Sequence, residues 1–169
     1  MGSLAGTLFY VAHTIGVDKN DKEIIRIDDV TSVVGMSKQY NIFELQKAIG
    51  RRNAARSIEI MERMLNAGES PISMIVMLSR YFQKLWVVQE LRSTHTPNFQ
   101  LASALGVSPF FLEEYYAASS NYQDEMFAQC FVALTEADEA LKSSSTDPKL
   151  IMTILIYRCV RSARTAVVA

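Results

Sequence analysis

The sequence has little cysteine and histidine, few prolines, and no long apolar run. Its two cysteines, Cys130 and Cys159, stand alone inside helical patterns, so we expect reduced core thiols, with a disulfide between them as the alternative. No apolar stretch approaches the roughly 20 residues that a membrane span requires, so no membrane is implied. With a net charge of -1, the chain also lacks the basic excess that drives nonspecific nucleic-acid binding.

Motifs for catalysis and for ligand binding are missing as well. No glycine is followed by lysine, so a phosphate-cradling loop and ATP binding are not supported. His13 and His95 lie far apart without zinc-ligand spacing, and both are interpreted as surface or helix-end histidines. No Gly-x-Ser-x-Gly turn occurs that would present a nucleophile. We therefore expect no catalytic residue, no metal site and no cofactor in this chain, which is predicted not to be an enzyme.

What the chain does contain is a series of helix boundaries. With 169 residues, 49% of them hydrophobic, it is large enough for one main core. Each proline follows a residue that can cap a helix, at Ser70-Pro71, Thr96-Pro97, Ser108-Pro109 and Asp147-Pro148. Glycines fall just past apolar periodic runs, at Gly35, Gly50, Gly68 and Gly106. The segments between these boundaries show no β-strand pattern of any length, and the fold is predicted to be an all-α helical bundle.

The first complete helix is predicted at residues 41–50. Asn41 would cap it, Glu44 would reach back to the cap amide, and Gly50 would supply the left-handed position at its end. Further helices are expected at residues 51–66, 71–93, 99–105, 109–119, 122–142 and 147–164. The helix at 71–93 is apolar over much of its circumference, so it is predicted to lie at the centre of the bundle, with Tyr81 and Trp86 in the core.

Four aromatic residues are candidates for a contact surface. Phe110, Phe111, Tyr115 and Tyr116 fall within the short helix predicted at residues 109–119. If this helix keeps an aromatic edge outward, that edge would contact another subunit.

Several of these segments together resemble a known family, the delta subunit of the bacterial DNA polymerase III clamp loader. The resemblance is carried by Tyr40–Gly50, the Arg- and Ala-rich helix that runs to Gly68, Ser79–Leu85, Ala102–Phe110, and the helix that ends at Lys142. These motifs occur in the family's order and spacing from Tyr40 to about Tyr157.

The resemblance implies a domain order and a set of partners. Delta subunits are related to AAA+ ATPases and have an ATPase-like domain, a small helical lid and a helical collar domain. On this basis residues 1–36 are expected to be the end of the lid, 37–165 the collar (oligomerisation) domain and 166–169 a tail. Met1-Gly2-Ser3 resembles an expression remnant, so the chain is expected to be cut from a longer protein.

The family's partners are the gamma/tau and delta-prime subunits of the clamp loader. The resemblance further implies that the sliding clamp is contacted by an N-terminal domain that this sequence does not include. DNA is expected to be contacted only indirectly, through the complex, because the loop at Ser143–Asp147 holds no aromatic residue for stacking on a base. A cytoplasmic location and a non-catalytic role in DNA replication are the corresponding expectations.

A helix-turn-helix DNA-binding regulator is the alternative. Leu101–Pro109, followed by a helix, is also how such a DNA-reading motif begins. The candidate recognition helix, however, carries Glu113 and Glu114, and no Arg or Lys occurs from Gly106 to Asp124. Because carboxylates would face the DNA phosphates, the pattern favours two core helices joined by a tight turn.

Overall fold

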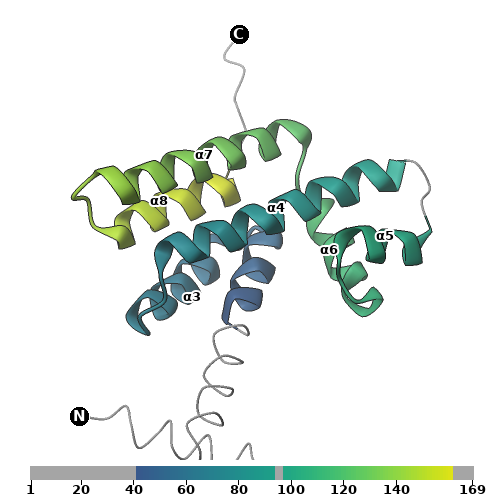
Figure 1. The fold of residues 1–169 in the computed structure, drawn as a ribbon, viewed down its shortest axis with the longest axis horizontal. Coiled ribbons are helices and arrows are strands. Elements are labelled where there is room, and N and C mark those ends of the chain that lie inside the picture. The colour runs from purple at the N-terminus through teal and green to yellow at the C-terminus, as the bar shows by residue number, and fades with distance from the viewer. Residues whose placement is uncertain (1–40, 94–96, 162–169) are drawn as a thin grey trace, which may run out of the picture. The chain divides into compact units, whose positions relative to one another are not determined.

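A computed structural model of the chain describes residues 41–93 and 97–161, and the elements assigned there are all helical (Figure 1). Residues 41–50 form the first of these helices. It is followed by α3 (Ala54–Asn66), α4 (Pro71–Ser93), α5 (Asn98–Leu105), the 3-10 turn η1 (Pro109–Phe111), α6 (Leu112–Ser119), α7 (Asp124–Ser143) and α8 (Pro148–Arg161). The predicted all-α class is confirmed. The predicted lid, the tail and His13 and His95 lie outside the described residues.

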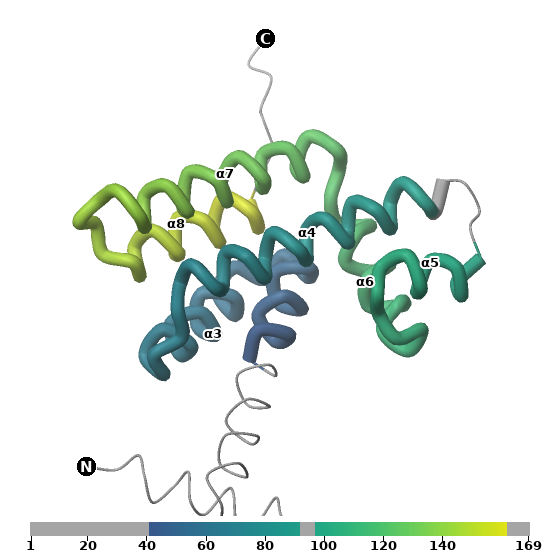
Figure 2. Tube along the Cα trace, viewed as in Figure 1, coloured from purple at the N-terminus to yellow at the C-terminus, as the bar shows by residue number. Residues whose placement is uncertain are grey.

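The long helix α4 passes through the middle of the bundle, as predicted (Figure 2). Its first part packs with the 41–50 helix, α3, α7 and α8 around a main core that includes Leu78, Phe82 and Leu85. Its last part packs with α5 and α6 around a separate small core formed by Val88, Leu101, Ala102, Leu105 and Leu112. The expected main core is present, and the small core beside it was not predicted. We call α5, η1 and α6 the small lobe.

Helix starts follow the proline pattern at three of the four predicted positions. The side chains of Ser70, Ser108 and Asp147 accept hydrogen bonds from backbone amides in the first turn that follows each of them. At the remaining position α5 begins at Asn98, so Pro97 is the N-cap residue and not the first helical one. Helix α3 also starts later than predicted. Asn53 caps it by accepting a hydrogen bond from the Arg56 amide at 3.0 Å.

Three helices end with a residue in the left-handed conformation. In each, the amide of this residue and the amide of the next one donate hydrogen bonds back to carbonyls near the end of the helix. Gly68 (φ 83°) and Gly106 (φ 59°) occupy the left-handed position after α3 and α5, as their spacing predicts. After the 41–50 helix the position is taken by Arg52 (φ 55°), with Asn53 N–H donating to the Ala48 carbonyl at 3.0 Å. The Arg52 guanidinium Nε donates to the Val160 carbonyl at 2.9 Å, which ties this turn to the end of α8.

Gly50 has a different role from the one predicted. It is helical and buried, and its φ is not positive. A Cβ placed there would lie 2.3 Å from the Tyr81 hydroxyl oxygen and 2.8 Å from the Ala118 Cβ. Glycine is therefore needed because α4 and α6 approach this backbone closely. Asn41 is itself helical, so the prediction that it is the N-cap residue is also wrong.

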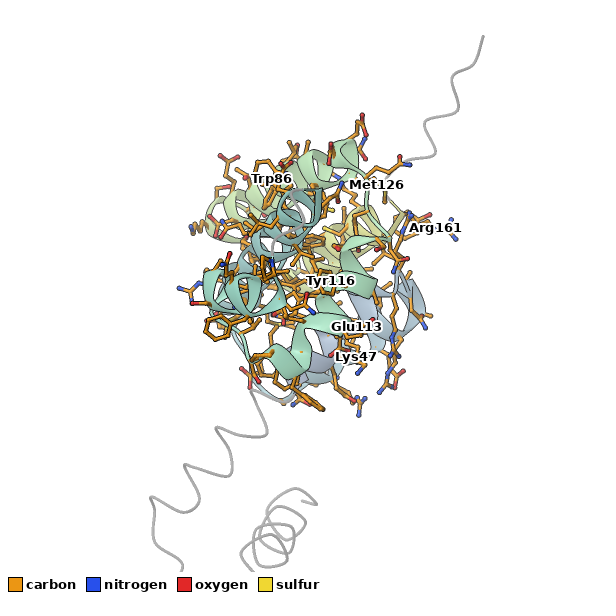
Figure 3. All side chains as sticks on the ribbon, turned by 90° about the vertical axis from the view of Figure 1, so that its right-hand side faces the viewer. Lys47, Trp86, Glu113, Tyr116, Met126 and Arg161 are labelled. Atoms are coloured by element: carbon orange, nitrogen blue, oxygen red, sulfur yellow. The ribbon has the colours of Figure 1, made fainter. Side chains whose placement is uncertain are left out.

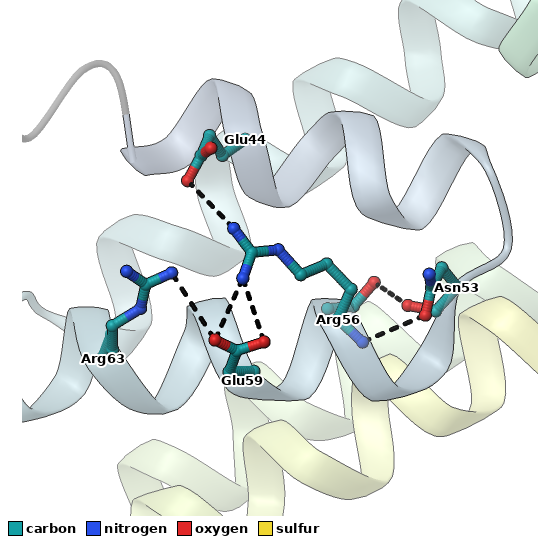
Figure 4. Close-up of polar contacts among 6 residues, drawn as sticks. Glu44, Asn53, Arg56, Glu59 and Arg63 are labelled. Carbon is teal, nitrogen blue, oxygen red and sulfur yellow. Dashed lines mark hydrogen bonds and ion pairs between the residues drawn. The ribbon is translucent and has the colours of Figure 1, made fainter.

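Charged side chains link the 41–50 helix to α3 (Figure 4). Arg56 lies 2.9 Å from Glu59 and 3.8 Å from Glu44, and Glu59 also lies 3.7 Å from Arg63, the four-residue pair that the sequence predicts. These groups are partly or largely exposed, and such pairs contribute only a few tenths of a kcal/mol each. Burial of apolar side chains, rather than charge, therefore holds α3 in place.

Candidate interaction surface

The small lobe carries three strongly exposed phenylalanines. Phe110 and Phe111 in η1 are 85% and 50% exposed, and Phe99 in α5 is 79% exposed. The rings of Phe110 and Phe111 meet edge to face, with centroids 5.4 Å apart. Large aromatic side chains left in water at one lobe are typical of a protein contact surface, since burying them against a partner is favourable.

These phenylalanines stand on a rigid base. Leu112, next to them in the chain, is buried in the small core. On the other side, Ser108 caps η1, and Pro109 fixes the backbone at its first position. The Tyr116 hydroxyl donates to Asn98 Oδ1 at 2.8 Å, which joins the end of α6 to the start of α5. The backbone that carries the exposed rings is therefore fixed before any partner binds.

Of the four predicted surface residues, the structure leaves two exposed and two half-buried. Tyr115 packs against both cores, with its ring centroid 5.8 Å from that of Tyr81. Burial, and to a lesser degree the nearby Glu114 carboxylate, raises the pKa of Tyr115. Tyr116, which is labelled in Figure 3, is held by its hydrogen bond to Asn98. Both tyrosines are therefore tied into the fold more than Phe110 and Phe111 are.

Phe99 was missed by sequence reasoning although a signal for it exists. The buried residues Leu101, Ala102 and Leu105 define the inner side of α5, and at 100° per residue Phe99 falls outside it.

The prediction for Trp86 was wrong in the opposite sense. It was expected in the core, yet it is 46% exposed and rests against Phe131 of α7 with ring centroids 6.2 Å apart.

The segment proposed as a DNA reader is acidic in the structure. Glu113 and Glu114 occupy the first turn of α6, the helix that would enter the groove. Glu114 lies 2.6 Å from Lys47 of the 41–50 helix, so the nearest lysine is engaged within the protein. Carboxylates at this place would repel phosphates, and the surface suits a protein partner better than DNA.

The described residues contain no cluster of three or more potential metal-ligating side chains. Within the same ranges no helix has the length and apolar character to cross a membrane. Cys130 and Cys159 are buried and form no disulfide, as predicted, and Cys130 Sγ lies 3.7 Å from the Cys159 carbonyl oxygen. A hydrogen bond with Cys130, and then burial, raises the pKa of Cys159 well above its usual range. The Cys159 thiol therefore stays protonated, and both cysteines act as core side chains.

Residues 39–159 match the family model described as DNA polymerase III delta subunit, C-terminal domain. The chain belongs to this family. It is 26% identical over 141 residues to DNA polymerase III subunit delta of Bacillus subtilis (strain 168), an alignment that covers 83% of this chain and 41% of the relative. Among solved structures it is similar in fold to the Bacillus subtilis DNA clamp loader delta protein, with a TM-score of 0.65 and 24% identity over 92% of this chain and 44% of that one.

The family match therefore covers most of the helical domain described above. This chain spans about two-fifths of the length of the relatives it matches. The matched residues include the whole small lobe and its exposed phenylalanines. The match supports the delta-family interpretation of residues 101–109, and the helix-turn-helix regulator is not supported.

Proposed function

We propose that this chain is the C-terminal part of a clamp-loader delta subunit and that its helical domain is an assembly module without catalytic activity. Its partners would be the gamma/tau and delta-prime subunits. The sliding clamp would be contacted by a part of delta outside this sequence, and DNA only through the complex. The protein would act in the cytoplasm, where replication takes place, without binding a membrane.

Membership of the delta family supports this role, because the family relatives are named as polymerase III and clamp-loader delta proteins. The composition supports it as well, since the net charge of -1 gives no basis for independent DNA binding. A module of this kind works mechanically. By joining its neighbours, it would hold the rest of delta at a fixed place in the complex.

The observation that carries the proposal is the pair of exposed rings on η1. Phe110 and Phe111 are held on a capped turn that begins with proline, so little backbone freedom remains to be lost on binding. Tyr115 and Tyr116 are half-buried and would form the edge of the same interface. Rigid aromatic anchors of this type commonly dominate the binding energy of protein interfaces. A stable interface would bury roughly 800 Å² on this side.

The test is co-migration on a sizing column with light scattering, using the chain mixed with purified gamma/tau and delta-prime subunits. We expect the wild-type chain to join one defined assembly. Replacing both rings (F110A/F111A) is expected to weaken this association by about tenfold or more, because two anchor side chains are lost. The matched control is F43A, which removes a phenylalanine that is 55% exposed on the 41–50 helix and is not part of the small lobe.

The possible outcomes separate the parts of the proposal. A wild-type chain that ignores both subunits, at concentrations where a full-length delta subunit binds them, would overturn the assembly role. Unchanged association of F110A/F111A would leave the assembly role intact and remove the aromatic pair from the interface. If F110A/F111A and F43A weaken the association equally, the exposure of an aromatic ring does not by itself identify the contact surface.

A further inference from the structure

Helix α8 carries a second exposed apolar stripe, far from the small lobe in sequence. Leu150, Ile154 and Tyr157 are 52%, 50% and 48% exposed. They follow one another at steps of four and three residues, the spacing of a seam that packs against another helix. Apolar residues scattered singly over a surface need no explanation. Three exposed apolar residues aligned along one helix do need an explanation, because they form a continuous strip.

The stripe is bordered by charged pairs on both sides. Lys149 Nζ lies 3.1 Å from Glu62 on α3, and Arg158 pairs with Glu136 on α7. An apolar centre with a polar rim is the usual layout of a protein interface. Within the described residues, α8 packs on α3 and α7 through its other side, so the stripe faces away from both cores.

The two ends of the stripe carry opposite charges. Asp147 and Arg161 lie seven residues before and seven residues after Ile154, and they continue the same register. Asp147 precedes the first turn of α8 and accepts a hydrogen bond from the Lys149 amide at 2.9 Å. Arg161 is exposed in the last turn, with its guanidinium carbon 5.1 Å from the centre of the Tyr157 ring. The stripe is thus negative at its start, apolar in the middle and positive at its end.

We propose that this stripe, from Asp147 to Arg161, is a self-complementary surface that binds the α8 helix of a second copy of this chain in antiparallel orientation. An antiparallel pair centred near Ile154 brings each Arg161, about 10 Å from the centre, beside Asp147 of the other copy. A parallel pair would instead place like charges together at both ends. Antiparallel helices also oppose their dipoles favourably, and a two-fold axis is the commonest symmetry of protein dimers.

The dimer should be weak. Helix α8 has 14 residues, so the seam is only about 20 Å long, and one helix pair buries less than a standard interface. Dissociation constants in the range of about 10 µM to 1 mM are expected for such a contact. The proposal does not depend on the assembly role given above, because it concerns the chain alone.

The experiment is sedimentation equilibrium of the full 169-residue chain over about 10 µM to 1 mM. We expect a monomer–dimer equilibrium for wild type and a dissociation constant at least about tenfold higher for I154E, which places a charge at the centre of the seam. The matched control is V76E on α4, at a position 44% exposed, which should leave the equilibrium unchanged. Circular dichroism melting of each variant confirms that the fold is retained.

Charge exchange tests the orientation and does not depend on I154E remaining folded. D147R and R161D alone should each weaken self-association, because each places like charges at both ends of an antiparallel seam. The double variant D147R/R161D should restore it, whereas a parallel pair would not recover. Wild type that stays monomeric to about 1 mM, or a double variant no better than the singles, would overturn the proposal. Wild type that is monomeric alone, together with I154E that fails to join other clamp-loader subunits, would overturn it too and assign the stripe to a neighbouring subunit.

Discussion

The two ends of α4 lie in very different surroundings. Around its first part the main core includes a network of aromatic rings, in which Phe82 meets Tyr122 and Tyr122 meets Phe127, each with centroids 5.5 Å apart. Around its last part the small core has only five buried residues, and none of them is aromatic. The small lobe instead exposes its phenylalanines to water. One helix therefore joins a region that provides stability to a region that presents a surface.

The largest effect is expected from breaking the main core. Phe82 is completely buried and contacts the rings of Tyr81 and Tyr122. Phe82→Ala should lower the free energy of unfolding by about 3–5 kcal/mol, because it removes a buried ring and leaves a cavity. Urea unfolding followed by circular dichroism measures this. Phe99→Ala, which removes an exposed ring of the small lobe, should change stability by less than about 0.5 kcal/mol. Similar losses for the two variants would contradict the division into two regions.

A smaller and more local effect is expected in the small core. Leu112 is 3% exposed and packs with Val88, Leu101 and Leu105. Leu112→Ala should cost about 2–3 kcal/mol, since a leucine side chain is lost from a shallow site that can partly collapse. Hydrogen exchange is expected to show lost amide protection in α5 and α6 while α7 and α8 keep theirs. If protection falls equally in all helices, the two cores unfold as one unit.

The close approach at Gly50 links the two regions, because it lies against both α4 and α6. Gly50→Ala should destabilise the protein by about 1–3 kcal/mol, since the added methyl group would overlap the Tyr81 hydroxyl and Ala118. Thermal melting measures the loss. Gly68→Ala is the instructive contrast. Nothing lies within 4 Å of a Cβ there, and only its left-handed backbone (φ 83°) opposes the change. Combining Gly50→Ala with Tyr81→Phe should relieve part of the overlap and recover some stability.

The smallest effect concerns alkaline pH. The Tyr122 hydroxyl donates to the Ile49 carbonyl at 2.8 Å, and burial raises the pKa of Tyr122 far above its usual value. The protonated phenol is therefore favoured in the folded state, so its contribution is complete below about pH 10 and declines as the pH rises further. Tyr122→Phe should cost about 1–2 kcal/mol at neutral pH. It should also make stability fall less steeply above pH 10, as measured by urea unfolding at several pH values. An unchanged slope would mean that Tyr122 does not ionise on unfolding.

Much of the fold could be predicted because its boundaries are local. Ser70, Ser108 and Asp147 cap helices through amides only two or three residues away, and Gly68 and Gly106 end helices through bonds that span one turn. The role of Gly50 could not be predicted, because it depends on Tyr81 and Ala118, which approach only in the folded protein. The second core was missed for a similar reason. Val88 is as apolar as Leu85, and sequence alone does not show which partner covers each residue.

The candidate surface was predicted in part. Phe110 and Phe111 were identified because four aromatic residues cluster in one short helix, which could keep an aromatic edge outward. Tyr115 and Tyr116 have the same residue character, but tertiary contacts with Tyr81 and Asn98 hold them in place. The pattern of aromatics thus located the lobe. It could not separate the rings that stay in water from those that are tied into the fold.

The left-handed turn at Arg52 has a consequence for the order of folding. A non-glycine residue in this conformation is energetically unfavourable by itself, and here its side chain bonds to the Val160 carbonyl, 108 residues later in the chain. A ribosome makes the protein from its N-terminus, so the 41–50 helix is complete long before Val160 exists. Asn121 and Tyr122 can bond the carbonyls of Gly50 and Ile49 earlier, but the bond from the Arg52 side chain has to wait until α8 has been made. Among the described helices, the last to be synthesised therefore completes the turn that ends the first.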